Sequence, residues 1–326
     1  MKTRVGRLPL VDSHIHLWEV SKYSGIKYPW LDSHPELNKS FLLKELRDAT
    51  QSFPVKSFVF VQADCEPSQS LAEVEWVTKL AEKNPRICGI VAHAPLENGA
   101  DVRQHLIILK KNPLVKGVRR LLQNENTEFF SNPKFIEGVK MLAEFDFSFD
   151  ICIKASQLPA AIELVKLCPG VKFVLDHLGK PDVAGKQFTS WQENITKLAL
   201  LPGGVHCKIS GLITEANHKT WHVDDLRPYV LHAIQAFGID RVIFGSDWPV
   251  VNLAGTYIKW INALDNMVSS FSEKDLRKLL YQNCENFYRL PSPVPTSSTV
   301  HSFHYSQPTT QPAEEKRAAA QLVSKL

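Results

Sequence analysis

Short apolar segments alternate with longer amphipathic segments along most of the chain. Eight segments rich in Val, Ile and Phe stand at 9–15, 57–63, 87–93, 115–121, 147–154, 171–176, 205–210 and 241–246. They do not alternate strictly between apolar and polar residues, which is typical of parallel strands covered by helices. The segments between them include amphipathic patterns at 69–83, 133–145, 157–167, 226–237 and 272–282. Eight strands, each followed by a helix, predict an α/β protein with a single (β/α)8 TIM barrel.

The alternation of apolar and amphipathic segments stops near residue 290, which predicts a folded domain followed by a segment of different character. Residues 1–290 are expected to form the barrel domain. Residues 291–326 are rich in Pro, Ser and Thr and lack hydrophobic periodicity until the end, so we expect a disordered tail. The chain ends in Ser324, Lys325 and Leu326, a tripeptide read by the peroxisomal import receptor. The expected location is the peroxisome, with the cytoplasm as the alternative. A fluorescent fusion carrying 291–326 should be punctate, and the full-length protein should become diffuse when its last three residues are deleted; diffuse signal from both would exclude the address.

Composition and charge exclude some classes of function. The chain is 44% hydrophobic and 22% charged, with a net charge of +4 and no long basic block, which argues against a nucleic-acid partner. No apolar run approaches the ~18 residues of a membrane-spanning helix. The six cysteines form no C-x-x-C pair, which is typical of reduced thiols in an intracellular protein.

Candidate chemistry lies where the predicted strands end. The first strand ends in Asp-Ser-His-Ile-His, and alternation along a strand places His14 and His16 on the same face. Two imidazoles facing the barrel mouth suit a divalent metal. The sixth strand runs into His177 and the eighth into Asp247. Because reactive groups sit at the carboxyl ends of barrel strands, these four residues are expected to converge.

These motifs resemble the amidohydrolase superfamily, in its amidohydrolase 2 branch. The segments DSHIHLW, KGVRRLLQ, LDHLGKP, CKISGL and FGSDWPV are similar to enzymes that hydrolyse sugar-acid lactones, such as L-fuconolactonases and L-rhamnonolactonases. The similarity spans nearly all of 9–290. It implies a hydrolase of carboxylic esters, a lactonase of carbohydrate metabolism, that opens a small aldonolactone by attack of Asp-activated water.

The resemblance also implies a role for each residue. Asp247 is expected to be the general base, and His177 to orient the carbonyl or complete a metal shell. His14, His16 and Asp247 are the expected metal ligands, if a metal is present. Arg119 is expected to bind substrate oxygens. Trp30 and Trp248 are candidate walls for a sugar ring, and Glu215 a candidate hydroxyl acceptor.

Departures from the superfamily pattern leave two questions open. Strand four offers Arg119 rather than a bridging Lys or Glu, and strand five ends in Lys154 without a histidine, so two metals are not expected. One divalent metal, such as zinc, and a metal-free site are equally compatible with the remaining residues. The alternative activities are decarboxylation of a small carboxylic acid by the same residues, and a catalytically idle barrel that only binds ligands. The intact set of His14, His16, His177 and Asp247 argues against the idle barrel.

Overall fold

A closed arrangement of parallel strands forms the centre of the molecule. The computed structural model describes residues 4–21 and 25–291. Its sheet has eight strands in the order of the chain, each parallel to the next. They are β1 (Leu10–Ile15), β2 (Val55–Val61), β3 (Ile87–Ala92), β4 (Val115–Val118), β5 (Ser148–Ile151), β6 (Lys172–Leu175), β7 (His206–Ile209) and β8 (Val242–Phe244). The predicted (β/α)8 barrel is confirmed.

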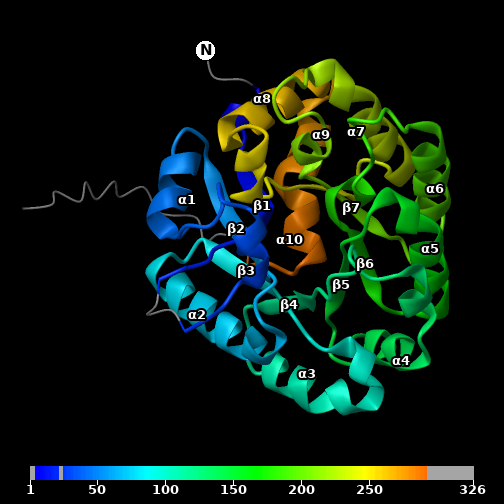
Figure 1. Ribbon diagram of the computed structural model, residues 1–326. Helices are drawn as coiled ribbons and strands as arrows, with labels where there is room; N and C mark the ends of the chain where they lie inside the picture. The colour runs from blue at the N-terminus through cyan, green and yellow to red at the C-terminus, as the bar shows by residue number, and fades with distance from the viewer. Residues whose placement is uncertain (1–3, 22–24, 292–326) are drawn as a thin grey trace, which may run out of the picture. The chain divides into compact units, whose positions relative to one another are not determined.

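Helices surround the strands (Figure 1). They are α1 (Leu43–Thr50), α2 (Ser70–Lys83), α3 (Arg103–Lys110), α4 (Pro133–Met141), α5 (Leu158–Leu167), α6 (Thr189–Ala199), α7 (Val223–Phe237), α8 (Tyr257–Met267), α9 (Glu273–Arg277) and α10 (Asn283–Phe287). The predicted helix at 272–282 is in fact α9 followed by a π-helical turn at Lys278–Gln282. Amphipathic periodicity cannot separate these, because both place apolar residues on nearly the same face.

Polar residues fix where several helices begin. Asn132 accepts a hydrogen bond from the Lys134 backbone N–H ahead of α4, whose first residue is Pro133. Thr256 and Ser272 cap α8 and α9 in the same way. Each cap satisfies an N–H that has no partner within its helix, and a proline in the first turn has no N–H to satisfy.

The barrel closes where the end of β1 meets the loop after β8. Ile15 pairs with Trp248 in a parallel bridge. The Asp247 N–H donates to the His14 carbonyl at 2.9 Å, and the His16 N–H donates to the Trp248 carbonyl at 2.7 Å. The backbone bonds that close the barrel therefore also bring Asp247 beside both histidines of the H-x-H motif.

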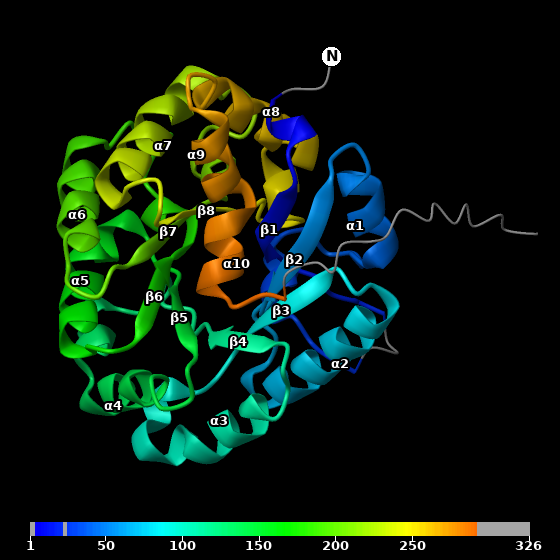
Figure 2. The ribbon, with the colours of Figure 1, turned by 180° about the vertical axis from the view of Figure 1, so that it is seen from behind.

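Apolar residues form two separate clusters. The larger one lies between the strands and the helices. The smaller one fills the barrel interior and contains Val11, Val59, Val61, Val91, Val174 and Ile243, with Cys284, Phe287, Tyr288 and Leu290 from the end of the domain. Figure 2 shows α10 lying across one end of the barrel. The side chain of Asn283 in α10 donates to the carbonyls of Ile239 and Val242 at the start of β8, which identifies the amino end of the strands.

Three further sequence predictions concern the cysteines, membrane-spanning helices and the end of the chain. The six cysteines are free thiols, and five of them are buried. Over the part of the chain that the structure describes, no helix combines the length and the apolar character that crossing a membrane requires. The predicted tail at 291–326 begins with the one described residue Pro291, and its Ser-Lys-Leu end lies outside the described residues, so the tail and its address stay predictions.

Candidate active site

The two histidines of the H-x-H motif face each other at the carboxyl end of β1. Their side chains are buried, and their Nε2 atoms lie 3.2 Å apart. His16 Nδ1 lies 2.8 Å from the Val61 carbonyl oxygen, which can only accept a hydrogen bond. Nδ1 of His16 therefore carries a proton. Nε2 of His16 lies 3.3 Å from Asp247 Oδ1.

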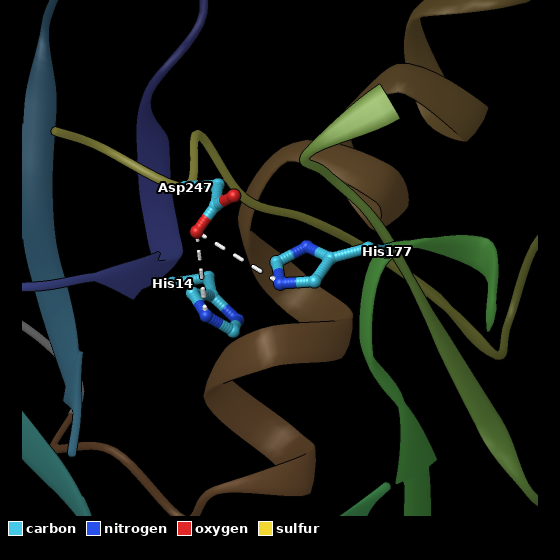
Figure 3. A group of neighbouring side chains, drawn as sticks. All are labelled: His14, His177 and Asp247. Atoms are coloured by element: carbon cyan, nitrogen blue, oxygen red, sulfur yellow. Dashed lines mark ion pairs between the residues drawn. The ribbon is translucent and has the colours of Figure 1, made fainter. Parts of the chain in front are cut away.

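His177 and Asp247 complete the group from strained loop positions after β6 and β8. Both have left-handed backbones, with φ of 53° and 61°, a conformation that is uncommon for residues other than glycine. In Figure 3 the rings of His14 and His177 approach one carboxylate oxygen of Asp247. Their Nε2 atoms lie 3.7 Å and 3.8 Å from Oδ1.

Gly211, just after β7, makes room for His177. Its φ is +60°, and a Cβ at this position would lie 2.5 Å from His177 Nδ1 and 3.1 Å from Asp247 Oδ2. Ser210, the preceding residue, lies with its Oγ 2.9 Å from the same Nδ1. The turn after β7 therefore sets the position of the His177 ring.

Burial and mutual contact set the charges of the group. Burial lowers the pKa of His177 to about 4 and lowers that of His14 well below its usual value. Burial alone would raise the pKa of Asp247, but the neighbouring His177, His16 and His14 outweigh it and hold that pKa below its ordinary value. At neutral pH His14 and His177 are therefore neutral imidazoles beside the carboxylate of Asp247.

This donor set fits a divalent cation. Ligand atoms of His14, His177 and Asp247 all lie within 4.8 Å of one another, and His16 Nε2 is as close to Asp247 as either of them. Imidazole nitrogens and a carboxylate oxygen directed at one point repel each other unless a cation or a proton lies between them, and nitrogen with oxygen is a usual ligand set of zinc. A second group, Cys152, Asp176 and His177, lies beside the first and shares His177.

The side chains of Arg119 and Arg120 point in opposite directions, as the alternation of strand residues predicts. Arg119 is 4% exposed, and its guanidinium contacts the Gln62 carbonyl, Asp176 Oδ2 and His14 Nε2. Its Nε has no hydrogen-bond partner among the described residues. Arg120 points away and forms ion pairs with Glu97 and Glu125. Arg119 is thus the one directed into the barrel mouth.

A cavity of about 480 Å³ opens above these side chains. Its charged and imidazole-bearing lining residues are His16, His34, Asp64, Arg119, His177, Lys180, Glu215, His218 and Asp247. Trp30 also lines it, half-buried, and donates its indole N–H to the Ala63 carbonyl. A cavity walled by this mixture of donors and acceptors suits a polyhydroxylated molecule.

Trp248 does not line this cavity, so the structure gives no support to its expected role as a sugar wall. It is 2% exposed and packs edge-on against Phe41 with ring centroids 5.6 Å apart. Lys154, which follows β5, is exposed and lines an adjacent cavity.

Sequence reasoning missed Lys180 and Asp64 as cavity residues. Lys180 donates to Gln123 Oε1 at 2.5 Å and has a φ of 48°. Lys180 belongs to the LDHLGKP segment that carried the resemblance, so a signal was present. Asp64 follows β2 with a φ of 57°, and nothing in its sequence context distinguishes it from a turn residue.

The fold and the site define a (β/α)8 hydrolase-type barrel with imidazoles and a carboxylate at the carboxyl end of its strands. A model of the amidohydrolase family matches residues 11–290, and the chain belongs to this family. The predicted membership is confirmed.

Three known proteins show where in the family the similarity lies. The L-fucono-1,5-lactonase of Burkholderia ambifaria is 29% identical over 291 residues, which cover 87% of this chain and 96% of that protein. The L-rhamnono-gamma-lactonase of Scheffersomyces stipitis is 24% identical over 339 residues, covering 88% and 100%. A crystal structure of an amidohydrolase from Burkholderia multivorans with bound zinc has a TM-score of 0.78 and 27% identity, covering 87% of this chain and all of that one.

Proposed function

We propose that this protein opens the ring of a sugar-acid lactone by hydrolysis. The observation that carries the proposal is the buried group of His14, His16, His177 and Asp247, whose nitrogens surround one carboxylate oxygen beneath a polar cavity. The similarity to a fuconolactonase and a rhamnonolactonase over nearly their whole length supports the substrate class. Decarboxylation would use the same residues, but no described residue favours it over hydrolysis.

In this proposal Asp247 moves the proton. Its carboxylate takes a proton from water as the water oxygen attacks the lactone carbonyl. The tetrahedral oxyanion then collapses, the ring C–O bond breaks, and Asp247 returns the proton to the leaving alkoxide. One water is consumed, and the products are a carboxylic acid and a hydroxyl on the same chain.

The surrounding residues position the substrate. Arg119 lines the cavity with a guanidinium fixed by its contacts, and such a group suits a carbonyl or hydroxyl oxygen of the substrate. Trp30 offers a flat apolar surface to the ring, and Glu215 and Lys180 supply an acceptor and a donor for its hydroxyls. One divalent ion held by His14, His177 and Asp247, with His16 beside them, would polarise the carbonyl and acidify a bound water.

Asp247→Asn tests the proposal against a panel of γ- and δ-lactones, with turnover followed as proton release with and without chelator. We expect a loss of kcat of about 10³-fold or more, because removing a general base together with a charge at the reacting atoms eliminates the central step. Asp240→Asn is the matched control. Asp240 precedes β8 at its amino end, where it pairs with Lys278, and Asp247 follows β8 at the other end.

Near-normal turnover by Asp247→Asn would remove Asp247 as the base. If no lactone is opened by the unaltered protein, the proposed reaction itself is wrong. Turnover that survives chelator would assign the chemistry to the side chains alone, whereas loss with chelator and return with Zn²⁺ would add the ion.

A further inference from the structure

A second cavity, of about 640 Å³, lies beside the one above the candidate site. Three side chains, those of Gln123, Lys180 and Glu215, line both cavities, so the two spaces meet along them. The residues of the second cavity follow β4, β5, β6 and β7 or begin α6, which places it on the same side of the barrel as the candidate site. Each cavity by itself has the volume of a pocket for one small ligand, which is typically ~300–1,000 Å³.

The shared side chains have unused hydrogen-bonding capacity. Among the residues that the structure describes, none forms a hydrogen bond or an ion pair with the carboxylate of Glu215. The ammonium of Lys180 donates to Gln123 Oε1 at 2.5 Å, and an ammonium has further N–H groups to donate. Both side chains are half-buried. A molecule that lies across this boundary would therefore find an acceptor and a donor there.

The lining of the second cavity is polar. Eight of its ten residues have polar side chains, and the exceptions are Ala155 and Trp191. Trp191 is 2% exposed, and its indole N–H is committed to the Leu178 carbonyl at 2.8 Å. The cavity thus offers little apolar surface, so an acyl or aryl group placed in it would gain little from burial.

The charges of this lining are balanced. Two ammonium groups, from Lys154 and Lys180, stand against two carboxylates, from Asp182 and Glu215. A phosphate or a second carboxylate on the ligand would meet as many carboxylates as ammonium groups. An uncharged group that carries both donors and acceptors suits this lining better, and a sugar ring with its hydroxyls is such a group.

We propose that the second cavity is a subsite for a sugar unit attached to the lactone, so that the substrate is the lactone of a disaccharide acid. Glu215 and Lys180 then lie at the junction of the two rings. Ser156, Gln187 and Ser190, which are exposed in the second cavity, bind hydroxyls of the attached sugar. The inference rests on the proposed function for the place of the lactone ring, which lies in the first cavity.

Binding of ring-opened acids tests the subsite without any turnover. Lactobionate and melibionate both consist of gluconate with a galactose attached, at different hydroxyls. We expect at least one of them to bind the full-length protein, in isothermal titration calorimetry, at least about 10-fold more tightly than gluconate. A gain of this size needs only one or two additional net hydrogen bonds. The proposal is wrong if neither binds more tightly than gluconate. It is also wrong if phosphogluconate binds more tightly than both, since the cavity would then take an anion.

Ser190→Trp places an indole in the second cavity alone, because Ser190 lines that cavity and not the first. We expect the affinity for the preferred disaccharide acid to fall at least about 10-fold, while the affinity for gluconate stays within about twofold. Glu193→Trp is the matched control, since Glu193 is exposed on the same helix and lines neither cavity. It should leave both affinities unchanged. An undiminished affinity of Ser190→Trp for the disaccharide acid would refute the subsite, and if this variant does not fold, the wild-type affinities still decide.

The lactones of the same acids separate this inference from the proposed function. If simple lactones are opened but no disaccharide acid binds more tightly than gluconate, the subsite alone is contradicted. If a disaccharide acid binds as expected and Ser190→Trp weakens it, but no lactone is opened, the proposed function alone is contradicted. When both hold, the kcat/KM of the preferred disaccharide lactone should exceed that of glucono-δ-lactone by at least about 10-fold, and Ser190→Trp should remove this advantage.

Discussion

The two ends of the barrel interior are equally buried but are built from opposite kinds of side chain. At the amino end, Val11, Val59 and Ile243 pack against Phe287 and Leu290 from the end of the domain. At the carboxyl end, imidazoles, carboxylates and a guanidinium are buried to a similar extent, with His14 at 0% and Asp247 at 4% exposure. Apolar burial contributes about 25 cal/mol per Å², whereas buried charges cost free energy unless they are paired. The amino end therefore stabilises the fold, and the carboxyl end uses part of that stability to hold reactive groups.

If the amino end only stabilises the fold, a substitution there should lower the free energy of unfolding without changing kcat. Phe287→Ala removes a buried ring that packs against Tyr288 and His206, with centroids 4.8 Å and 4.6 Å away. We expect the free energy of unfolding, measured by urea denaturation, to fall by about 3–5 kcal/mol, as for other buried Phe→Ala changes. The kcat of the molecules that remain folded should be unchanged.

Phe287→Leu is the control for this variant, since it keeps most of the apolar volume and should cost much less. A fall in the kcat of the Phe287→Ala molecules that remain folded would contradict this division of roles between the two ends. It would show that the apolar end is coupled to the candidate site, most directly through Tyr288 and its bond to Asp150.

The sequence predicts the apolar strands and the four central residues of the candidate site for different reasons. Eight Val- and Ile-rich segments are enough to identify the strands, because burial on both faces leaves a continuous apolar signal. His14, His16, His177 and Asp247 were found because parallel strands bring their carboxyl ends together at one edge of the barrel. Trp30 and Glu215 line the cavity as expected.

Pairing between distant strands could not be predicted in this way. Lys208 and Asp150 are 58 residues apart and meet only through the curvature of the barrel, so each looks like an isolated charge in an apolar strand. Trp248 was expected in the cavity wall because aromatic faces pack against sugar rings, but it turns away to pack on Phe41. The direction of a side chain after a left-handed residue such as Asp247 does not follow strand alternation.

Two glycines at opposite ends of β7 allow the two ends of the barrel to be compared with a smaller loss of stability. Gly203, before the strand, and Gly211, after it, both have positive φ, of 94° and 60°. Alanine at either position should cost about 1–2 kcal/mol of stability, because the left-handed region strains a residue with a Cβ. Only at Gly211 would that Cβ meet the site, 2.5 Å from His177 Nδ1, whereas at Gly203 no heavy atom lies within 4 Å.

We therefore expect Gly211→Ala to lower kcat on the preferred lactone by about 100-fold, since displacing a reacting group by about 1 Å has an effect of that size. Zn²⁺ affinity should fall with it, because His177 is one of the ligands in the proposed metal site. Gly203→Ala bears the backbone strain without the clash, so it should lose no more stability in urea than Gly211→Ala and keep its kcat within about twofold. If both variants lose activity equally, backbone strain in β7 is sufficient to disable the site. If neither does, the His177 ring has freedom that its contacts with Ser210 and Gly211 do not suggest, and its position is set from the β6 side alone.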